Sequence, residues 1–360
     1  MRKVLAWCLA ALAVLAVGGY ALYEMTPWPR ALIVRAAFDR EAVGAMRLLE
    51  KHAPANVSAL LDVRYDVDDN DASLDVYFPA SAQPAGAALP TIVWIHGGAW
   101  ISGHKDYVGS YLKILAAQGY TAISVNYSLA PGATYPKPVR QAFEALAFLM
   151  RDPQRFHVDP TRLVLAGDSA GAQIAAQVAA IAASPVYAMQ VGVAPTVFAA
   201  QIKGALLFCG AYDADSVKLD GAFGDFLRTV LWAYSGKRDF RDDPAFATFS
   251  VAHYVTATFP PTFVTAGNAD PLEPQSKELA RTLKSKGVSV DELFFAADEK
   301  PPLPHEYQFN LDWGAGVKAR DRALAFLRRV TAPSADQGFS APMSGSTSAA
   351  TTVNMNTNNQ

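Results

Sequence analysis

The stretch that decides the fold is Leu163-Val164-Leu165-Ala166-Gly167-Asp168-Ser169-Ala170-Gly171. Its first four residues are apolar, as in a strand buried on both faces of a sheet, and residues 170–183 predict a helix of mostly small residues directly after it. A Gly-x-Ser-x-Gly sequence between a strand and a helix predicts a nucleophile elbow, a strained turn that lifts the serine hydroxyl clear of the sheet. We therefore predict that Ser169 is a nucleophile. The alternative is a glycine-lined turn that carries an inert serine.

The same alternation of strand and helix extends along the chain on both sides of this turn. Short, mostly apolar runs predict strands at 74–78, 91–95, 122–125, 163–166, 205–208, 262–265 and 293–295. Stretches with helical spacing lie between them, near 106–118, 138–151, 170–183 and 274–287. This order predicts an α/β fold, a mostly parallel sheet with helices on both faces.

A second motif, His96-Gly97-Gly98-Ala99-Trp100, follows the predicted strand 91–95. A glycine pair at this place lets backbone N–H groups face a reacting carbonyl, where such donors stabilise the oxyanion of a tetrahedral intermediate. We predict that the N–H groups of Gly97, Gly98 and Ala170 form this oxyanion hole. The alternative is a glycine turn that only changes the direction of the chain. We interpret His96 as a residue that braces the loop rather than a catalytic one.

A serine nucleophile needs a general base. Two histidines follow Ser169 in the sequence, His253 and His305. In a fold of this kind the catalytic carboxylate precedes the histidine along the chain. His305 follows the last predicted strand and satisfies this order, whereas His253 comes before the best carboxylate. We therefore predict His305 as the base; the alternative is a histidine on a surface loop.

The base in turn needs a carboxylate that orients it. Asp270 lies just past the predicted strand 262–265, and catalytic groups gather at the carboxyl ends of parallel strands. Asp213, after the preceding strand, is its chief rival. We prefer Asp270, although a helix N-cap ahead of Pro271 would explain the same residue.

At this point the chain resembles the hormone-sensitive-lipase-like carboxylesterases. The matching motifs, in order, are His96-Gly97-Gly98, Asn126-Tyr127-Ser128-Leu129-Ala130-Pro131, Gly167-Asp168-Ser169-Ala170-Gly171, Asp270-Pro271-Leu272 and His305. The resemblance covers about residues 60 to 330. It implies an α/β-hydrolase fold with a small lid region, and it implies the same catalytic triad and the same three oxyanion donors.

Two residues depart from the family pattern. Ala99 stands where the family often has a third glycine, which puts the tolerance for acyl or alcohol groups near the oxyanion hole in doubt. Ser128 stands where the family usually has arginine, which concerns local packing and not the chemistry.

The expected reaction is the cleavage of a small-molecule carboxylic ester of short or medium acyl chain through an acyl-enzyme. The resemblance suggests the chain length, and segment 213–255 is too short for a large lipid-binding cap. We expect no cofactor, and no metal because the six histidines are scattered. One alternative is an arylformamidase-like amide hydrolase, since similar His-Gly-Gly loops occur there. A non-catalytic binding module is the other.

Two further segments carry open interpretations. Segment 213–255 interrupts the alternation with large apolar residues at helical intervals, and it predicts either a lid over the substrate pocket or an ordinary crossover helix. Residues 31–52 have helical spacing and predict either a helix that covers the entrance to a site or one that merely packs on the domain.

The overall composition argues against a nucleic-acid partner. The chain has 31 basic and 33 acidic residues among 360, a net charge of -2, and no long block of one sign. Phosphate binding needs a concentrated basic surface, which this balance does not supply. The two cysteines, Cys8 and Cys209, fall in an apolar leader and a predicted core strand, so we expect no disulfide between them.

The N-terminus predicts a membrane segment. Arg2 and Lys3 precede 19 uncharged residues, Val4 to Leu22, which as a helix would span roughly 28 Å at 1.5 Å per residue. We expect a membrane anchor with the catalytic domain on the extracytoplasmic side. The alternatives are secretion after cleavage of a signal peptide near Ala21, and a buried N-terminal helix.

These observations divide the chain into four parts. Residues 1–25 are the anchor or signal segment, and residues 26–59 a helical segment that begins at the Pro27 and Pro29 break. Residues 60–332 form the α/β-hydrolase domain. Residues 333–360, rich in Ser, Thr, Ala, Asn and Gln, predict a disordered tail.

Overall fold

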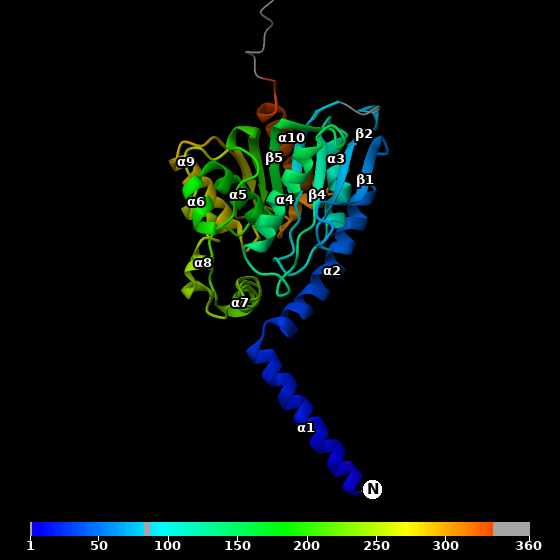
Figure 1. The fold of residues 1–360 in the computed structure, drawn as a ribbon, viewed down its shortest axis with the longest axis vertical. Helices are drawn as coiled ribbons and strands as arrows, with labels where there is room; N and C mark the ends of the chain where they lie inside the picture. Colours follow the sequence, from blue (N-terminus) through cyan, green and yellow to red (C-terminus); the bar gives the residue numbers. More distant parts are fainter. Residues whose placement is uncertain (1, 83–86, 334–360) are drawn as a thin grey trace, which may run out of the picture.

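The computed structural model describes residues 2–82 and 87–333 and contains a twisted sheet flanked by helices (Figure 1). Within these residues the sheet has eight strands in the order β1-β2-β4-β3-β5-β6-β7-β8. The strands are β1 (Val57–Arg64), β2 (Ser73–Pro79), β3 (Leu89–Ile95), β4 (Thr121–Val125), β5 (Val158–Asp168), β6 (Ile202–Phe208), β7 (Thr262–Thr265) and β8 (Val290–Leu293). β2 pairs antiparallel with β1 and β4, and all other pairs are parallel. The predicted α/β-hydrolase fold with its mostly parallel sheet is confirmed.

Helices cover both faces of this sheet. They are α3 (Gly109–Ala116), α4 (Lys137–Arg151), α5 (Ser169–Ala183), α6 (Pro185–Val191), α9 (Glu273–Ser285) and α10 (Gly314–Val330), whereas α7 (Gly221–Ser235) and α8 (Pro244–Ala247) lie beyond the ends of the strands (Figure 1). Successive residues of β3 point into two separate apolar cores, Val93 into one and Trp94 into the other. The first core contains side chains of α4, α5 and α9, and the second those of α3 and α10. Burial on both faces explains why the central strands have continuous apolar sequences.

Two strands differ from the sequence prediction. β1 begins at Val57, inside the segment 26–59 that we expected to be helical, and it is an edge strand whose half-exposed residues lack a strong apolar run. β8 ends at Leu293, whereas the predicted strand runs from 293 to 295. Leu293 pairs with Thr265, the last residue of β7, so the chain beyond it has no neighbouring strand in register.

An ion cluster stabilises the antiparallel side of the sheet. The buried ammonium group of Lys105, in the 3-10 helix η2 (Lys105–Val108), lies 2.8 Å from carboxylate oxygens of Asp62 and Asp75 and 2.9 Å from Asp106. Burial alone would lower the pKa of Lys105, but its hydrogen bonds with these carboxylates raise it. Lys105 is therefore charged, and the buried Asp75 depends on it for a counter-ion.

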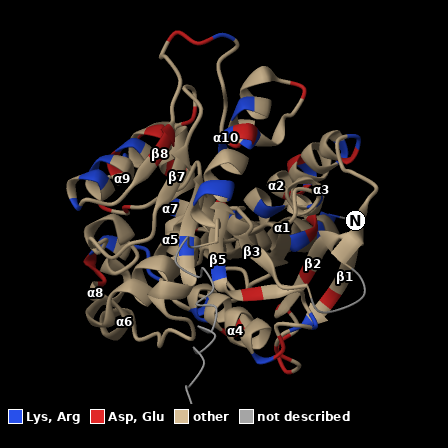
Figure 2. Ribbon diagram, turned by 90° about the horizontal axis from the view of Figure 1, so that it is seen from above, with Lys and Arg blue, Asp and Glu red and all other residues tan. Residues whose placement is uncertain are grey.

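Two helices precede the sheet. α1 (Arg2–Met25) has no buried residue, and α2 (Trp28–Glu50) begins after the break at Pro27 and runs along the domain (Figure 1). The tail from 334 to 360, for which we predict disorder, lies outside the described residues. On the side opposite α1, basic and acidic residues are interspersed along α9 and α10, which agrees with the near-neutral charge of the chain (Figure 2).

Candidate active site

The turn between β5 and α5 has the sharp geometry that the sequence predicts. Ser169 has a left-handed backbone with φ of 51°. A Cβ atom on Gly171 would lie 2.0 Å from the carbonyl oxygen of Ile95, and one on Gly167 would lie 2.5 Å from the Gly171 carbonyl group. Both glycines are therefore required for α5 to pack this closely against the strands.

Ser169, His305 and Asp270 meet at the carboxyl edge of the sheet. The Nε2 atom of His305 lies 2.9 Å from the Ser169 hydroxyl oxygen. The Nδ1 atom of His305 lies 3.0 Å from each carboxylate oxygen of Asp270, which is buried in the loop after β7. Asp270 also accepts the backbone N–H of Leu272 at 2.8 Å, which fixes its orientation. A hydroxyl, an imidazole and a buried carboxylate are thus hydrogen-bonded in a row.

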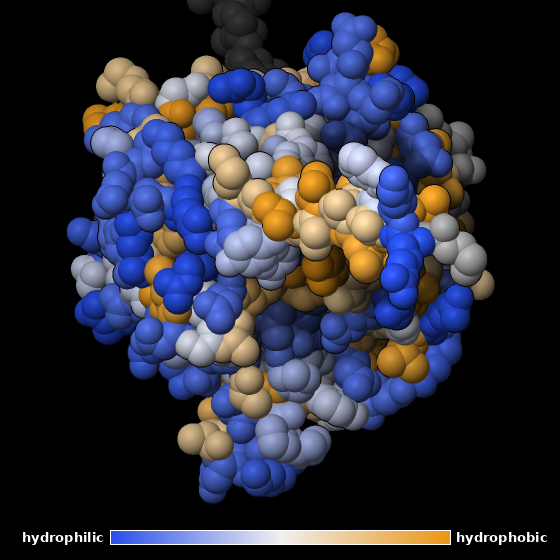
Figure 3. All heavy atoms as spheres, turned by 90° about the horizontal axis from the view of Figure 1, so that it is seen from below, coloured by the Kyte–Doolittle hydropathy of each residue, from blue (hydrophilic) through white to orange (hydrophobic). Residues whose placement is uncertain are grey.

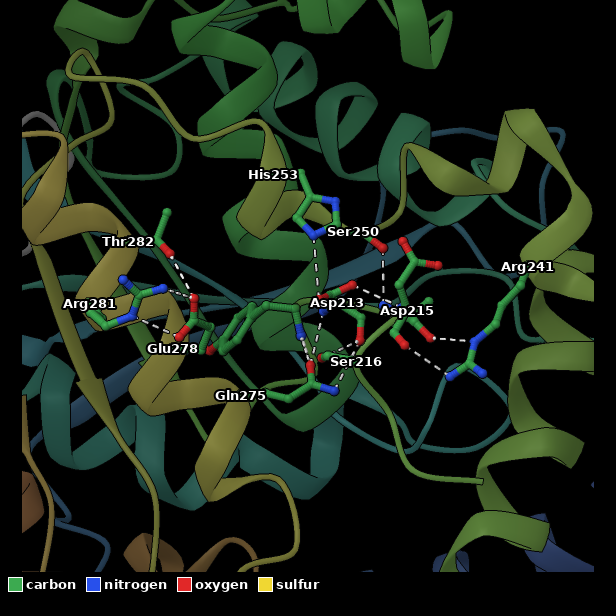
Figure 4. A network of polar contacts seen from close by, with 12 residues as sticks. Asp213, Asp215, Ser216, Arg241, Ser250, His253, Gln275, Glu278, Arg281 and Thr282 are labelled. Atoms are coloured by element: carbon green, nitrogen blue, oxygen red, sulfur yellow. Dashed lines mark hydrogen bonds and ion pairs between the residues drawn. The ribbon is translucent and has the colours of Figure 1, made fainter. Parts of the chain in front are cut away.

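The rival carboxylate lies in a different network (Figure 4). Asp213 has its backbone N–H and C=O groups bonded to the amide of Gln275, at 2.9 and 3.0 Å. Its side chain faces His253, with 3.4 Å between Nε2 and Oδ2. His253 is exposed, and neither residue bonds to Ser169 or His305 in the described chain. The structure therefore separates Asp213 and His253 from the hydroxyl of Ser169.

The charges around His305 favour its protonated form. Burial lowers the pKa of the imidazole, but the hydrogen bond with Asp270 and the charges of Asp270, Glu306 and Asp168 outweigh burial and raise the pKa of His305 to about 9. The neutral imidazole of His305 is therefore a strong proton acceptor, and the carboxylate of Asp270 stabilises the imidazolium that forms.

The predicted oxyanion loop needs one correction. The N–H of Gly97 donates to the Oδ2 atom of Asp168 at 2.8 Å, so it is already engaged by a protein acceptor. Gly98 has φ of 110°, and within the described residues the N–H groups of Gly98 and Ala99 donate to no protein acceptor. Ala170 lies in the first turn of α5, where N–H groups have no partner within the helix.

Asp168 is a structural partner of this loop that the sequence did not reveal. Besides Gly97, its carboxylate accepts the indole N–H of Trp94 at 2.6 Å. Burial raises the pKa of Asp168 well above its ordinary value, and the neighbouring charge of Glu306 raises it further. The Oε1 atom of Glu306 also lies 3.8 Å from His305 Nε2. Two acidic side chains therefore stand beside the nucleophile, in addition to Asp270.

His96 has the bracing geometry that we predicted for it. Its buried ring stacks on Tyr127 with 4.4 Å between ring centroids, and its Nδ1 atom lies 2.8 Å from the Gly97 carbonyl oxygen. The Tyr127 hydroxyl donates to the His96 carbonyl group at 2.9 Å. Burial lowers the pKa of His96 to about 4, so the ring is neutral and has a packing role at neutral pH.

A cavity of about 490 Å³ opens onto Ser169. Two of its walls come from α2 and α7, and the ring of Phe38 on α2 lies 5.6 Å from that of Phe226 on α7. Phe226 also stacks on its α7 neighbour Phe223, with 5.7 Å between the ring centroids. Residues of both segment 31–52 and segment 213–255, for which the sequence left two interpretations each, therefore line the cavity. The short helices after α7 stay outside its lining.

Two groups of side chains in the described residues have metal-ligand atoms within 4.8 Å of one another. One consists of Cys209, Asp270 and His305; the other consists of the half-buried Asp213 with the exposed Asp215 and His253. Burial raises the pKa of the Cys209 thiol well above its ordinary value, and the thiol donates to Gln308 at 3.6 Å. Cys209 is thus a neutral neighbour of the triad, which the sequence did not identify.

The fold, with a hydroxyl, an imidazole and a carboxylate in a row at the carboxyl ends of its strands, defines an α/β hydrolase. The family model described as alpha/beta hydrolase fold matches residues 92–298. The chain belongs to this family, and within it to the hormone-sensitive-lipase-like carboxylesterases.

Curated relatives share a little over a quarter of their residues with the chain. Carboxylesterase NlhH of Mycobacterium tuberculosis is 29% identical over 266 residues, which are 72% of this chain and 79% of the relative. Esterase LipQ of the same organism is 27% identical over 263 residues, 72% of this chain but only 59% of LipQ. An acetyl esterase of Salmonella agona is 28% identical over 273 residues, 72% and 77% of the two chains.

Solved structures share the fold. Esterase B from Lactobacillus rhamnosis superposes with a TM-score of 0.71 at 24% identity, over 84% of this chain and 96% of the other. The hyperthermophilic esterase from the archaeon Pyrobaculum calidifontis has a TM-score of 0.65 at 21% identity, over 83% and 91%. At these identities the likeness concerns the fold alone.

Proposed function

We propose that the protein is a serine hydrolase that cleaves carboxylic esters of short or medium acyl chain through an acyl-enzyme. The observation that carries the proposal is the 2.9 Å contact between His305 Nε2 and the Ser169 hydroxyl, with Asp270 bonded to the other ring nitrogen. This is the arrangement in which an imidazole removes the proton of an attacking hydroxyl.

The reaction would run in two halves. Ser169 Oγ attacks the ester carbonyl carbon while its proton moves to His305 Nε2, and the carbonyl oxygen becomes an oxyanion. The ester C–O bond then breaks, and the alcohol leaves with the proton from His305. A water molecule gives a proton to His305 and attacks the acyl-enzyme, after which the acid leaves and Ser169 regains its proton. Asp270 holds the imidazole in the required tautomer and stabilises its charged form.

We assign the oxyanion to the N–H groups of Gly98 and Ala170. The N–H of Ala99 is the third donor, because it has no protein acceptor in the described chain, whereas that of Gly97 is bonded to Asp168. Removal of one such donor in other enzymes costs about 10²–10³ in kcat.

The size of the cavity supports short or medium acyl chains. The 490 Å³ space beside Ser169 is lined by the aromatic rings of Phe38 and Phe226, and its volume suits a small ester. Two relatives are named carboxylesterase and acetyl esterase, which agrees with this substrate class.

We further propose that α1 anchors the protein in a membrane, with the catalytic domain on the extracytoplasmic side. Its 24 residues have a mean hydropathy of 2.1 in the most apolar window and no burial against the domain. Secretion after cleavage is the alternative. Membrane fractionation of the full chain, with N-terminal sequencing, separates them: an alkali-resistant pellet that retains Arg2 supports the anchor, and a shorter soluble protein supports cleavage.

The serine mechanism is tested with Ser169→Ala. The folded variant should lose more than 99% of the hydrolysis of a chromogenic acetate or butyrate ester. A phosphonate ester should label the wild type and not the variant. Substantial activity in the folded variant would exclude Ser169 as the nucleophile. Comparison of a formyl-aromatic amide with a short ester tests the amide-hydrolase alternative.

A further inference from the structure

The apolar helix α1 is directly connected to a wall of the active-site cavity. α2 begins three residues after α1 ends, and four of its cavity-lining residues are Phe38, Ala42, Ala45 and Leu49. Phe38 follows Trp28, the first residue of α2, by ten positions, roughly 15 Å along that helix at 1.5 Å per residue. The cavity therefore lies within a short distance of the end of α1.

The other wall is attached at the same point. The Glu24 carboxylate, at the end of α1, lies 2.7 Å from Arg30 of α2 and 3.3 Å from Arg238, which follows α7. Arg238 also donates to the Glu24 carbonyl group at 3.1 Å, and its guanidinium group lies over the ring of Trp232 in α7. Glu24 thus joins the ends of α1, α2 and α7. Charged groups that end an apolar helix mark where a bilayer meets water.

The position of α2 on the domain is fixed by polar contacts. Arg35 donates to the carbonyl groups of Ile101 and Ala130, at 2.5 and 2.8 Å. One turn further, Asp39 accepts the Ser102 hydroxyl at 2.6 Å, next to the oxyanion loop. Because these contacts hold α2 to the catalytic domain, the orientation of the cavity follows the orientation of α1.

Apolar side chains remain exposed between the end of α1 and the cavity. On the first two turns of α2, Trp28, Leu32 and Ile33 have 44%, 48% and 66% of their surface exposed. Phe223 of α7, which lines the cavity, is 37% exposed and lies at its rim. Figure 3 is seen from the side from which α1 projects, and the apolar side chains of α1 lie in front of the centre of this face. A tryptophan beside arginines is typical of a membrane–water boundary.

We infer that this face, made of the start of α2 and the exposed side of α7, lies on the bilayer that α1 enters, and that the active site takes its esters from that bilayer. The occupant of the face is the lipid surface, because the exposed apolar residues continue the apolar surface of α1. The substrate class is an amphiphilic carboxylic ester of medium acyl chain, dissolved in the adjacent leaflet. This inference rests on the ester hydrolysis and the membrane anchor proposed above.

The experiment uses the full chain in phosphatidylcholine vesicles and compares Ile33→Glu with Met189→Glu. Ile33 faces away from the domain, and Met189, 74% exposed on α6, is a matched apolar residue on another face. Each protein is assayed with water-soluble p-nitrophenyl acetate and with dioctanoylglycerol incorporated in the vesicles. Ile33→Glu should lower hydrolysis of the vesicle-borne ester at least fivefold and leave the soluble ester unchanged. Met189→Glu should change neither.

A second measurement reports contact with lipid without depending on activity. An environment-sensitive fluorophore is attached to Ile33→Cys or Met189→Cys in a Cys8→Ser background, since the other cysteine, Cys209, is buried. Nitroxide-labelled lipids should quench the fluorophore at position 33 and not at 189. Equal activity of Ile33→Glu on the vesicle-borne ester, or absence of quenching at 33, overturns the inference. A wild-type protein that hydrolyses neither ester contradicts the proposed function instead.

Discussion

The buried carboxylate of Asp168 accepts the backbone N–H of Gly97 at 2.8 Å, so the residue before the nucleophile holds the loop in which we place the oxyanion hole. The two residues are 71 positions apart and meet because β3 and β5 are parallel neighbours, with Ile95 opposite Gly167. The indole of Trp94 completes the contact from the side of β3.

Replacement of Asp168 by alanine should therefore lower kcat with little change in KM. The variant leaves the buried N–H groups of Gly97 and Trp94 without an acceptor, which costs about 1–3 kcal/mol, or roughly five- to a hundredfold in rate, if it is felt only in the transition state. Asp168→Asn keeps an acceptor and should lose less. Steady-state kinetics on a soluble ester measures both variants, and circular dichroism checks the fold. An unchanged kcat in folded Asp168→Ala would show that the contact has no part in the reaction.

The rate should rise with pH until His305 is neutral. A base with pKa of about 9 is mostly protonated at neutral pH, so kcat/KM should increase with pH toward about 9. The negative charge of Glu306 raises this pKa, and Glu306→Gln should therefore move the rise to lower pH. Glu299→Gln, on the loop that follows β8, is the control. The pH profile of kcat/KM measures the shift, and a shift to higher pH would contradict the sign.

Replacement of Asp270 and replacement of Asp213 should have very different effects on kcat. Asp270→Asn removes the charge beside His305 Nδ1 and favours the wrong tautomer, a change that cost about 10⁴ in kcat in the serine-protease case. Asp213→Asn keeps its backbone bonds with Gln275 and should change kcat by less than about threefold. Parallel kinetics of the two folded variants on one ester decides between them. A larger loss at Asp213 would reverse the assignment.

The aromatic wall of the cavity should limit acyl length. Phe226→Ala removes the ring that contacts Phe38 and Phe223, and it should raise the ratio of kcat/KM for decanoate over butyrate esters by roughly tenfold. Phe148→Ala, on α4 and outside the cavity lining, should leave the ratio unchanged. The measurement is a series of p-nitrophenyl esters of increasing chain length. An equal response of the two variants would show that Phe226 does not limit the chain.

The ion cluster around Lys105 should make a large contribution to the free energy of unfolding. Lys105→Met leaves the buried Asp75 without its counter-ion and should lower the free energy of unfolding by about 3–5 kcal/mol. Lys284→Met removes an exposed pair with Glu292 and should cost less than about 1 kcal/mol. Urea unfolding of both variants measures the difference, and similar midpoints would contradict the importance of the cluster.

Chain order and local turn geometry explain why the proposed triad could be predicted. The elbow is encoded by neighbouring residues, since Gly167 and Gly171 are needed within one turn of Ser169. Asp270 and His305 each follow a strand, and parallel strands bring their carboxyl ends to one edge. The preference for Asp270 over Asp213 depended on the same topology.

The positions of the two other acidic residues at the site, Asp168 and Glu306, could not be predicted in this way. Asp168 occupies the variable position of the Gly-x-Ser-x-Gly motif, and its bond to Gly97 depends on the register of two strands. Glu306 reaches the site from a left-handed backbone, with φ of 58°, which no local pattern indicates. The mistake over the Gly97 N–H follows from this gap, because a glycine pair shows that donors are accessible but not which acceptor each one meets.

The separate origins of the nucleophile and the cavity walls affect how this protein could diversify. Ser169 is positioned by backbone packed on backbone, with almost no tolerance at Gly167 or Gly171. The walls come from α2 and α7, which carry none of the three residues of the proposed triad. Mutations in these helices can therefore alter which molecules are accepted while the reaction chemistry stays intact. Substrate preference can thus change by single substitutions in α2 and α7, because these positions do not take part in the chemical step.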